Sequence, residues 1–228
     1  MLVLTSMVYS SMACTNLIVQ QAIQKNSISE SQATETASDA NVVAFLGDSL
    51  TAGPGLSTKE TFPAIIQQKI SGESLPWIVQ NSGVSGDTTS LALSRLNWAL
   101  KPNPKILVVA LGSNDGLRGL SIDVMEKNIR EIVSRAQQRG IKVILVGQKL
   151  PLNFPADYRK RFAGVFPRIA RQYRIPLVPF MLEGVALNEQ FVLEDGVHPN
   201  AEGAKKIADN VWPTLLSQLE KKSKSRRK

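Results

Sequence analysis

Residues 105–111 have the sequence KILVVAL, a run that is apolar after its first residue. A strand without polar alternation has to be covered on both faces, which is typical of parallel sheets flanked by helices. Similar short apolar runs recur along the chain, and segments with the spacing of amphipathic helices separate them. Strands are predicted at 41–46, 77–80, 105–111, 141–146 and 175–178, and helices at 61–70, 87–100, 122–139, 158–173 and 201–219. This alternation predicts an α/β fold in which helices cover both faces of a five-stranded parallel sheet.

Four polar clusters stand next to these segments, three of them where a predicted strand ends. They are GDSL at 47–50, NSGVSGD at 81–87, GSND at 112–115 and DGVHP at 195–199. The fourth cluster directly precedes the last predicted helix. In doubly wound folds the active site forms at the carboxyl ends of the strands, so we expect the first three clusters to converge on one edge of the sheet.

The residue types in these clusters are those of a serine hydrolase. A serine hydroxyl is a weak nucleophile and needs a base to accept its proton, for which imidazole is suited. We expect Ser49 to be the nucleophile and His198 its base, with Asp195 as the carboxylate that orients the imidazole. The Ser49 N–H, a glycine N–H from the second cluster and the Asn114 amide are candidates for stabilising the oxyanion that forms on the attacked carbonyl.

Each of these residues also has a purely structural interpretation. A Gly-Asp-Ser sequence after a strand is often only a turn, and Asn114 has the side chain of an Asx turn. A lone histidine is more often packed or solvated than catalytic. The joint occurrence of the four clusters, in this order and next to predicted strands, favours the catalytic interpretation.

The four clusters resemble the sequence blocks of the SGNH (GDSL-type) hydrolase superfamily. The similarity is greatest to its bacterial branch of thioesterase I, lysophospholipase L1 and arylesterase. The blocks are GDSLTAG, NSGVSGDTT, LGSNDGLRG and DGVHPNAEG, and the similarity extends from about residue 41 to about residue 219. The resemblance implies a flavodoxin-like three-layer α/β/α sandwich with no metal and no nucleotide cofactor. It also implies cleavage of carboxylic acyl esters, thioesters or lysophospholipids through an acyl-enzyme intermediate.

The resemblance also bears on the second cluster, which offers two glycines. Matching Ser-Gly-Asp-Thr at 85–88 to the block of this branch assigns the oxyanion glycine to Gly86, with Gly83 as the alternative. The chain departs from the pattern at Ser113, where close relatives often have glycine. This departure concerns the flexibility of the loop and leaves the assignment of Asn114 unaffected.

Two alternatives to the hydrolysis of acyl esters or thioesters are considered. One is the removal of O-acetyl groups from a polysaccharide or peptidoglycan on the same scaffold, and the other is a non-catalytic binding module. A complete set of candidate catalytic residues disfavours the binding module. Leu117 and Leu120, beside the third cluster, either line a groove for an acyl chain or cap the core.

Composition excludes several other kinds of site and partner. The single cysteine, Cys14, excludes an intramolecular disulfide, and the single histidine excludes a multi-histidine metal site. The formal net charge is +8, but residues 221–228 (KKSKSRRK) carry six positive charges and no acid, so the rest of the chain has a net charge of +2. We therefore expect no nucleic-acid partner. The tail, at 220–228, is expected to be solvated and disordered, with a weak contact to anionic lipid or polymer as the alternative.

Residues 1–40 are expected to form a signal-like segment and a linker in front of a hydrolase domain at 41–219. Residues 1–14 are uncharged and moderately apolar, too short and too polar to span a bilayer as a stable helix, and they fit the apolar region of a signal peptide. Cys14 ends this segment after a small residue and precedes a polar linker. We therefore expect an exported protein with Cys14 as a site of lipid attachment to the membrane. A cleaved secretory signal and a cytoplasmic location are the alternatives.

Overall fold

A computed structural model of the chain describes residues 41–219. Cys14, the expected linker up to residue 40 and the expected tail from residue 220 lie outside the described residues, so the interpretations made for them stay predictions. Within the described part, none of the helices combines the length and the apolar character needed to cross a lipid bilayer.

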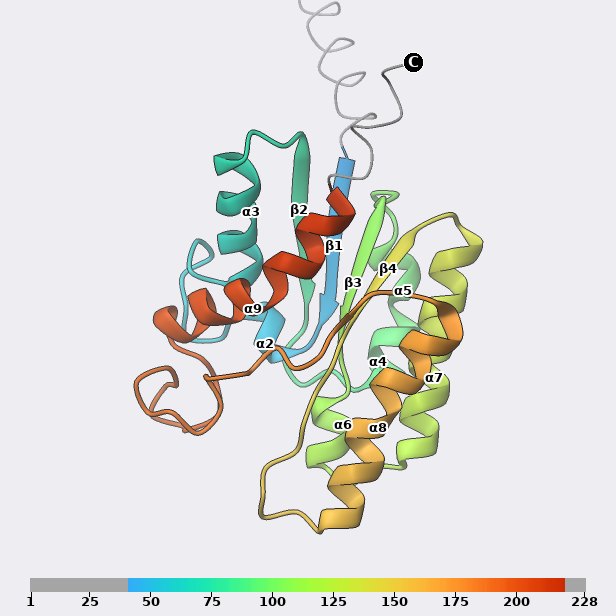
Figure 1. The fold of residues 1–228 in the computed structure, drawn as a ribbon, viewed down its shortest axis with the longest axis vertical. Helices are drawn as coiled ribbons and strands as arrows, with labels where there is room; N and C mark the ends of the chain where they lie inside the picture. The colour runs from blue at the N-terminus through green and yellow to red at the C-terminus, as the bar shows by residue number, and fades with distance from the viewer. Residues whose placement is uncertain (1–40, 220–228) are drawn as a thin grey trace, which may run out of the picture. The chain divides into compact units, whose positions relative to one another are not determined.

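One parallel sheet of five strands forms the centre of the domain, in the order β2-β1-β3-β4-β5. Figure 1 labels β1 to β4 of this sheet. The strands are β1 (Asn41–Gly47), β2 (Trp77–Gly83), β3 (Ile106–Ala110), β4 (Lys142–Val146) and β5 (Leu177–Val178). Gly47 at the end of β1 lies opposite Gly83 on β2 and Ala110 on β3, so the three strands end at the same level. The predicted five-stranded parallel sheet is confirmed, and the first three polar clusters meet at its carboxyl edge.

Helices cover both faces of the sheet because the side chains of each strand alternate between two apolar clusters. Val43 and Phe45 of β1 belong to one cluster, and Ala44 and Leu46 belong to the other. The first cluster includes α3 (Phe62–Gly72) and α9 (Ala201–Leu219), and the second includes α4 (Thr89–Ser94), α5 (Leu96–Ala99), α7 (Ile122–Gln138) and α8 (Ala156–Tyr173). The arrangement is the three-layer α/β/α sandwich that the sequence predicts.

Two short helices begin where strands end, and both belong to the polar edge of the sheet. They are α2 (Ser49–Ala52), which follows β1, and α6 (Ser113–Leu117), which follows β3. Gly112 precedes α6 with a φ of +112°, a backbone conformation that a residue with a side chain rarely adopts.

Three of the differences from the sequence prediction have identifiable physical reasons. β2 continues through residues 81–83, which the sequence predicts as loop, because pairing with β1 overrides the turn preference of Asn, Ser and Gly. The helix predicted at 87–100 is interrupted at Arg95, where φ is −100° and ψ is 8°. The fifth strand shortens to two residues, since Pro176 has no N–H to donate to a sheet.

Candidate active site

Ser49 is the first residue of α2, two positions beyond the end of β1. The turn from strand to helix is tight because Gly47 has no side chain; a Cβ there would lie 2.0 Å from Thr51 Oγ1. Asp48 begins the helix, and its Oδ1 accepts a hydrogen bond from the Leu50 N–H at 3.0 Å. This geometry holds Ser49 at the edge of the sheet, with its backbone N–H at the open N-terminus of the helix.

The loop that precedes α9 brings His198 and Asp195 to Ser49 across 149 positions of sequence. His198 Nε2 lies 2.9 Å from Ser49 Oγ, and His198 Nδ1 lies 2.6 Å from Asp195 Oδ2. The other oxygen of Asp195, Oδ1, accepts the N–H groups of Val197 at 2.8 Å and of His198 at 2.9 Å. The three side chains expected as nucleophile, base and orienting acid therefore form one hydrogen-bonded chain.

The surroundings of Asp195 favour its charged form. The hydrogen bond with the His198 side chain, followed by those from two backbone N–H groups, lowers the pKa of Asp195 from 3.8 to about 2. Gly196 makes the turn between acid and base with a φ of +68°. The Leu193 N–H donates to the His198 carbonyl at 2.7 Å and so closes the base of this loop.

Gly83 and Gly86 differ in whether their N–H groups are available. The Gly83 N–H donates to Asn81 Oδ1 at 2.9 Å, and a Cβ on Gly83 would lie 2.4 Å from the backbone nitrogen of Ala52. Gly83 therefore serves the close packing of β2 against α2. Gly86 has a φ of +82°, and its N–H finds no hydrogen-bond acceptor within 41–219. Of the two glycines, Gly86 is the one with a free donor.

Asn114 lies in α6 and lines the same cavity as Ser49. Its Nδ2 donates to the Asp87 carbonyl at 2.9 Å, which joins the end of β3 to the loop after β2. The amide carries a second hydrogen that this bond does not use. Arg118, at the end of α6, donates to the Gly86 carbonyl at 3.1 Å on the exposed side of the same loop.

Asp115, the neighbour of Asn114, anchors α6 from inside the protein. Thr89 donates its N–H to Asp115 Oδ2 at 2.8 Å and its hydroxyl to Asp115 Oδ1 at 2.6 Å. The Thr89 hydroxyl in turn accepts a hydrogen bond from Asn128 Nδ2 at 3.1 Å. These buried contacts fix α6, and with it Asn114, relative to α4 and α7.

Asp48 is a buried acid beside the candidate nucleophile. It is 1% exposed, and its Oδ2 has no hydrogen-bond partner among the described residues. Burial raises the pKa of Asp48 from 3.8 to about 6, although the hydrogen bond from the Leu50 N–H opposes this shift. The sequence indicates only that Asp48 adjoins Ser49 and gives no sign of its burial.

A largely apolar cavity of about 500 Å³ opens beside Ser49 and His198. Its walls come from α6, from the segment after β4 and from the loop after β5. Apolar residues of these walls include Leu117, Leu150, Leu152, Phe180, Leu182 and Leu187. Of the two leucines that the sequence places beside the third polar cluster, Leu117 lines the cavity, whereas Leu120 is not part of its wall. A cavity of this size and character suits an acyl chain.

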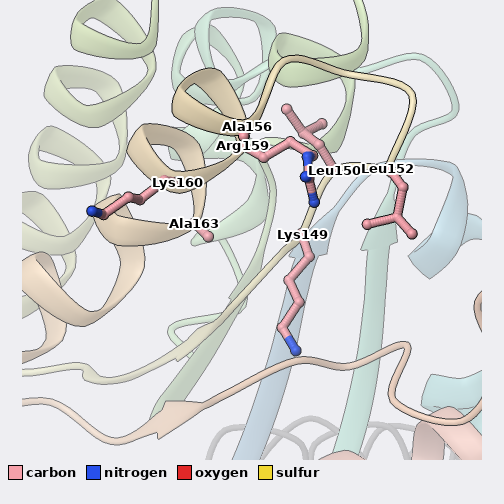
Figure 2. A pocket seen from close by; sticks show the side chains of 7 residues that line it. All are labelled: Lys149, Leu150, Leu152, Ala156, Arg159, Lys160 and Ala163. Atoms are coloured by element: carbon pink, nitrogen blue, oxygen red, sulfur yellow. The ribbon is translucent and has the colours of Figure 1, made fainter.

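A smaller hollow of about 320 Å³ shares Lys149, Leu150 and Leu152 with the cavity. Figure 2 shows that the side chains of Lys149, Arg159 and Lys160 reach away from one another, so their cationic groups converge on no common point. The Lys149 ammonium instead pairs with Glu183 at 3.4 Å. The hollow therefore extends the apolar wall and has no focused charge.

Arg95 and Asp87 connect the loops of the site, although neither is among the residues expected from the sequence. Arg95 Nε donates to Asp87 Oδ2 at 2.6 Å, and Arg95 Nη2 donates to the Gly47 carbonyl at 3.1 Å. In a segment with helical spacing an arginine predicts an exposed charge, so the sequence carries no signal for this inward contact. Within the described part, no group of three or more His, Cys, Asp and Glu side chains is placed to hold a metal ion.

Comparison with known proteins agrees with this geometry. Residues 45–206 match the model of the GDSL-like Lipase/Acylhydrolase family. Esterase TesA of Pseudomonas aeruginosa is 36% identical over 181 residues, which cover 79% of this chain and 90% of that protein. Thioesterase 1/protease 1/lysophospholipase L1 of Escherichia coli is 35% identical over 76% of this chain and 82% of its own length. A crystal structure of TesA superimposes with a TM-score of 0.76, covering 78% of this chain and 99% of that one.

Proposed function

Since the chain belongs to the GDSL-like lipase/acylhydrolase family, and is a carboxylic ester hydrolase of the SGNH type, we propose that Ser49, His198 and Asp195 are its catalytic triad. The observation that supports this most directly is the unbroken chain of contacts from Ser49 Oγ through the imidazole to the carboxylate, at 2.9 and 2.6 Å. Each contact is the one that its proposed role requires.

In the first half of the proposed reaction, Ser49 Oγ attacks the carbonyl carbon of the acyl group while His198 Nε2 accepts the hydroxyl proton. The carbonyl electrons move onto oxygen, and the N–H groups of Ser49 and Gly86 with the Asn114 amide stabilise the resulting oxyanion. When the carbonyl re-forms, the bond to the leaving alcohol or thiol breaks, and His198 gives its proton to that leaving group. Asp195 stabilises the imidazolium throughout.

In the second half, water replaces the leaving group and attacks the acyl-Ser49 ester. His198 Nε2 accepts a proton from this water and returns it to Ser49 Oγ as the acyl–oxygen bond breaks. The products are a carboxylic acid and the regenerated enzyme. The sequence of steps consumes one water per ester and needs no redox partner.

We propose that the acyl group of the substrate carries a long alkyl chain. We also propose that thioesters and lysophospholipids are among the substrates. The leucine-rich cavity beside Ser49 supports this, because an acetyl group would leave most of its 500 Å³ unfilled. The names of the relatives, an esterase and a thioesterase/lysophospholipase, point the same way. The cavity disfavours an O-acetyl esterase acting on a polysaccharide, the alternative function.

The test is a series of p-nitrophenyl esters from acetate to palmitate, assayed beside lysophosphatidylcholine and an acyl-CoA. We expect kcat/KM to rise with chain length until the cavity is filled and then to fall. Ser49→Ala is the background control for every substrate. A value of kcat/KM that is highest for acetate and falls steadily from there would favour the O-acetyl esterase.

We also propose that the enzyme is exported and attached to a membrane through lipid on Cys14. Support comes only from the sequence, in which Cys14 ends an uncharged apolar segment and precedes a polar linker. Fractionation of cells that express the full chain, with mass analysis of the mature N-terminus, tests both parts. A cytoplasmic protein that keeps Met1 would contradict both, and a periplasmic protein with an unmodified terminus would contradict the lipid alone.

A further inference from the structure

The loop between β2 and α4 carries Gly86 and Asp87, and Arg95 holds it from within the protein. Arg95 donates through Nε to the Asp87 carboxylate at 2.6 Å and through Nη2 to the Gly47 carbonyl at 3.1 Å. The side chains of Arg95 and Asp87 are only 18% and 6% exposed. A guanidinium is planar and rigid, so an arginine that is largely buried and bound to two segments fixes their separation.

Both partners of Arg95 lead to a proposed donor of the oxyanion hole. Gly47 lies two residues before Ser49, at the start of the tight turn that places the Ser49 N–H. Asp87 directly follows Gly86, and its carbonyl accepts the hydrogen bond from Asn114 Nδ2 at 2.9 Å. Arg95 thus connects the end of β1 directly to the loop after β2, and the Asp87 carbonyl connects that loop to α6; the proposed donors come from these three places.

We propose that Arg95 is a positioning residue of the oxyanion hole, one that sets the relative positions of the Ser49, Gly86 and Asn114 donors without touching the substrate. The inference rests on the proposed function. Donors stabilise an oxyanion only when they are aimed at the place where the charge develops, so a shift of about 1 Å can lower the rate by about 100-fold. A side chain that fixes two donor-bearing segments directly, and the third through Asp87, therefore acts on the rate of the chemical step.

The surroundings of Arg95 also favour a geometric role over a purely stabilising one. Its Nη1 is buried and has no acceptor in the part of the chain that the structure describes. A buried donor without a partner destabilises the folded state. Burying Arg95 so that Nε and Nη2 make their contacts therefore has a cost in stability, because Nη1 stays unsatisfied. Trp98 packs against the guanidinium, with the ring centroid 5.8 Å from Cζ, and limits its freedom to turn away.

Arg95→Gln removes the charge and the two-segment link while keeping a polar side chain, two atoms shorter, that can still donate hydrogen bonds. With p-nitrophenyl butyrate we expect kcat to fall by about 10- to 100-fold and KM to change by less than about threefold, because the donors act on the transition state. The matched control is Arg130→Gln on α7, which breaks an ion pair with Glu126 of comparable exposure, 27% and 15%, away from the site. We expect its kcat to stay within about twofold of the wild type.

A double-mutant cycle with Asn114→Ala separates positioning from a general loss of stability. Asn114→Ala alone should lower kcat by about 10²- to 10³-fold. If Arg95 acts through this donor set, the loss in the double variant should be smaller than the product of the two single losses, because the part that acts through Asn114 is already gone. Losses that multiply in full would show that Arg95 acts independently of Asn114 and would overturn the proposal.

Asp87→Asn provides a second route if Arg95→Gln does not fold. It removes the carboxylate that binds Arg95 but keeps the backbone carbonyl that accepts from Asn114. We expect the same fall in kcat and the same non-additivity with Asn114→Ala, and an unchanged kcat would overturn the proposal. Failure of the proposed function itself is distinguishable, since Ser49→Ala would then retain turnover.

Discussion

Asp48 and Asp195 are both aspartates of the site, and their surroundings are opposite. Asp48 precedes Ser49 at the rigid edge of the sheet, is 1% exposed and has one oxygen without a partner, and burial raises its pKa to about 6. Asp195 binds His198 in the loop before α9, and its side chain is 46% exposed. The hydrogen bond to His198 and two backbone N–H groups lower its pKa to about 2.

In the proposed mechanism the two regions of the site have different electrostatic tasks. A carboxylate that stabilises an imidazolium has to stay charged, and the solvated loop with its hydrogen-bond donors provides that. The edge of the sheet has to present neutral N–H donors to an oxyanion, and an ionised Asp48 beside them would repel it. Burial and the number of hydrogen-bond donors therefore shift the pKa values of two identical residue types in opposite directions.

The hydrogen bond between Ser49 and His198 joins these two regions, and breaking it should have the largest effect. We expect His198→Ala to lower kcat by several orders of magnitude, because members of a triad act as one unit. The melting temperature should change little, since His198 is partly exposed. Steady-state kinetics with p-nitrophenyl butyrate measures this, and retention of more than about a tenth of the turnover would contradict the assignment of the base.

Asp195→Asn tests the charged side of the comparison and should have the next largest effect. An asparagine turns an NH₂ group or a neutral oxygen toward Nδ1, so the preferred tautomer is no longer fixed, and kcat should fall by about 10³- to 10⁴-fold. Since the pKa of Asp195 is about 2, its carboxylate is ionised throughout pH 5–9. Titration of Asp195 itself therefore contributes no step to the pH profile of the wild type in that range. A variant that retains more than about a tenth of the turnover would mean that another acid orients the histidine.

Asn114→Ala tests the proposed oxyanion donors at the carboxyl edge of the sheet. Removing one oxyanion donor typically costs about 3–4 kcal/mol, so kcat should fall by about 10²- to 10³-fold with little change in KM. A loss confined to KM would make Asn114 a substrate-binding residue instead.

Gly86→Pro and Gly83→Pro extend the test, because of the two glycines only Gly86 has a free N–H. An active Gly86→Pro variant beside an inactive Gly83→Pro variant would reverse the choice of glycine.

The site residues at the carboxyl edge of the sheet were easier to predict from the sequence than the residues that surround them. Ser49 and Asn114 each follow an apolar strand, and parallel strands that end at one level bring such loops together, as the structure confirms. The three-residue spacing of Asp195 and His198 is local, so the sequence also predicts that they approach each other. The roles of these residues stay predictions until the variants are measured.

Other features depend on contacts that no local pattern specifies. The cavity is assembled from the segment after β4 and the loop after β5, neither of which has a helical or strand period. Arg95 lies at the interruption between α4 and α5, and its side chain binds the carbonyl of Gly47, 48 positions earlier. The burial of Asp48 is likewise not indicated by its sequence neighbours.

Asp48→Asn should have the smallest effect on turnover. Its effect should instead be on the pH dependence of the free energy of unfolding. Because the folded-state pKa of Asp48 is raised from 3.8 to about 6, the folded protein favours the protonated acid. The contribution of Asp48 to the free energy of unfolding is therefore fully present below pH 3.8 and is lost as the pH rises through about 6. The shift corresponds to about 3 kcal/mol between those limits.

The asparagine variant cannot ionise, so its free energy of unfolding relative to the wild type should rise by about that amount between pH 4 and pH 8. The pH dependence of this difference is the measurement, because any fixed effect of the new amide is the same at both ends. Urea unfolding at several pH values provides it, with Asp157→Asn, at an exposed aspartate of α8, as the control. The control should show no such rise, because the Asp157 side chain is exposed to solvent in the folded protein. A flat difference for Asp48→Asn would mean that water reaches this carboxyl, and that the edge of the sheet is no less solvated than the loop that carries Asp195.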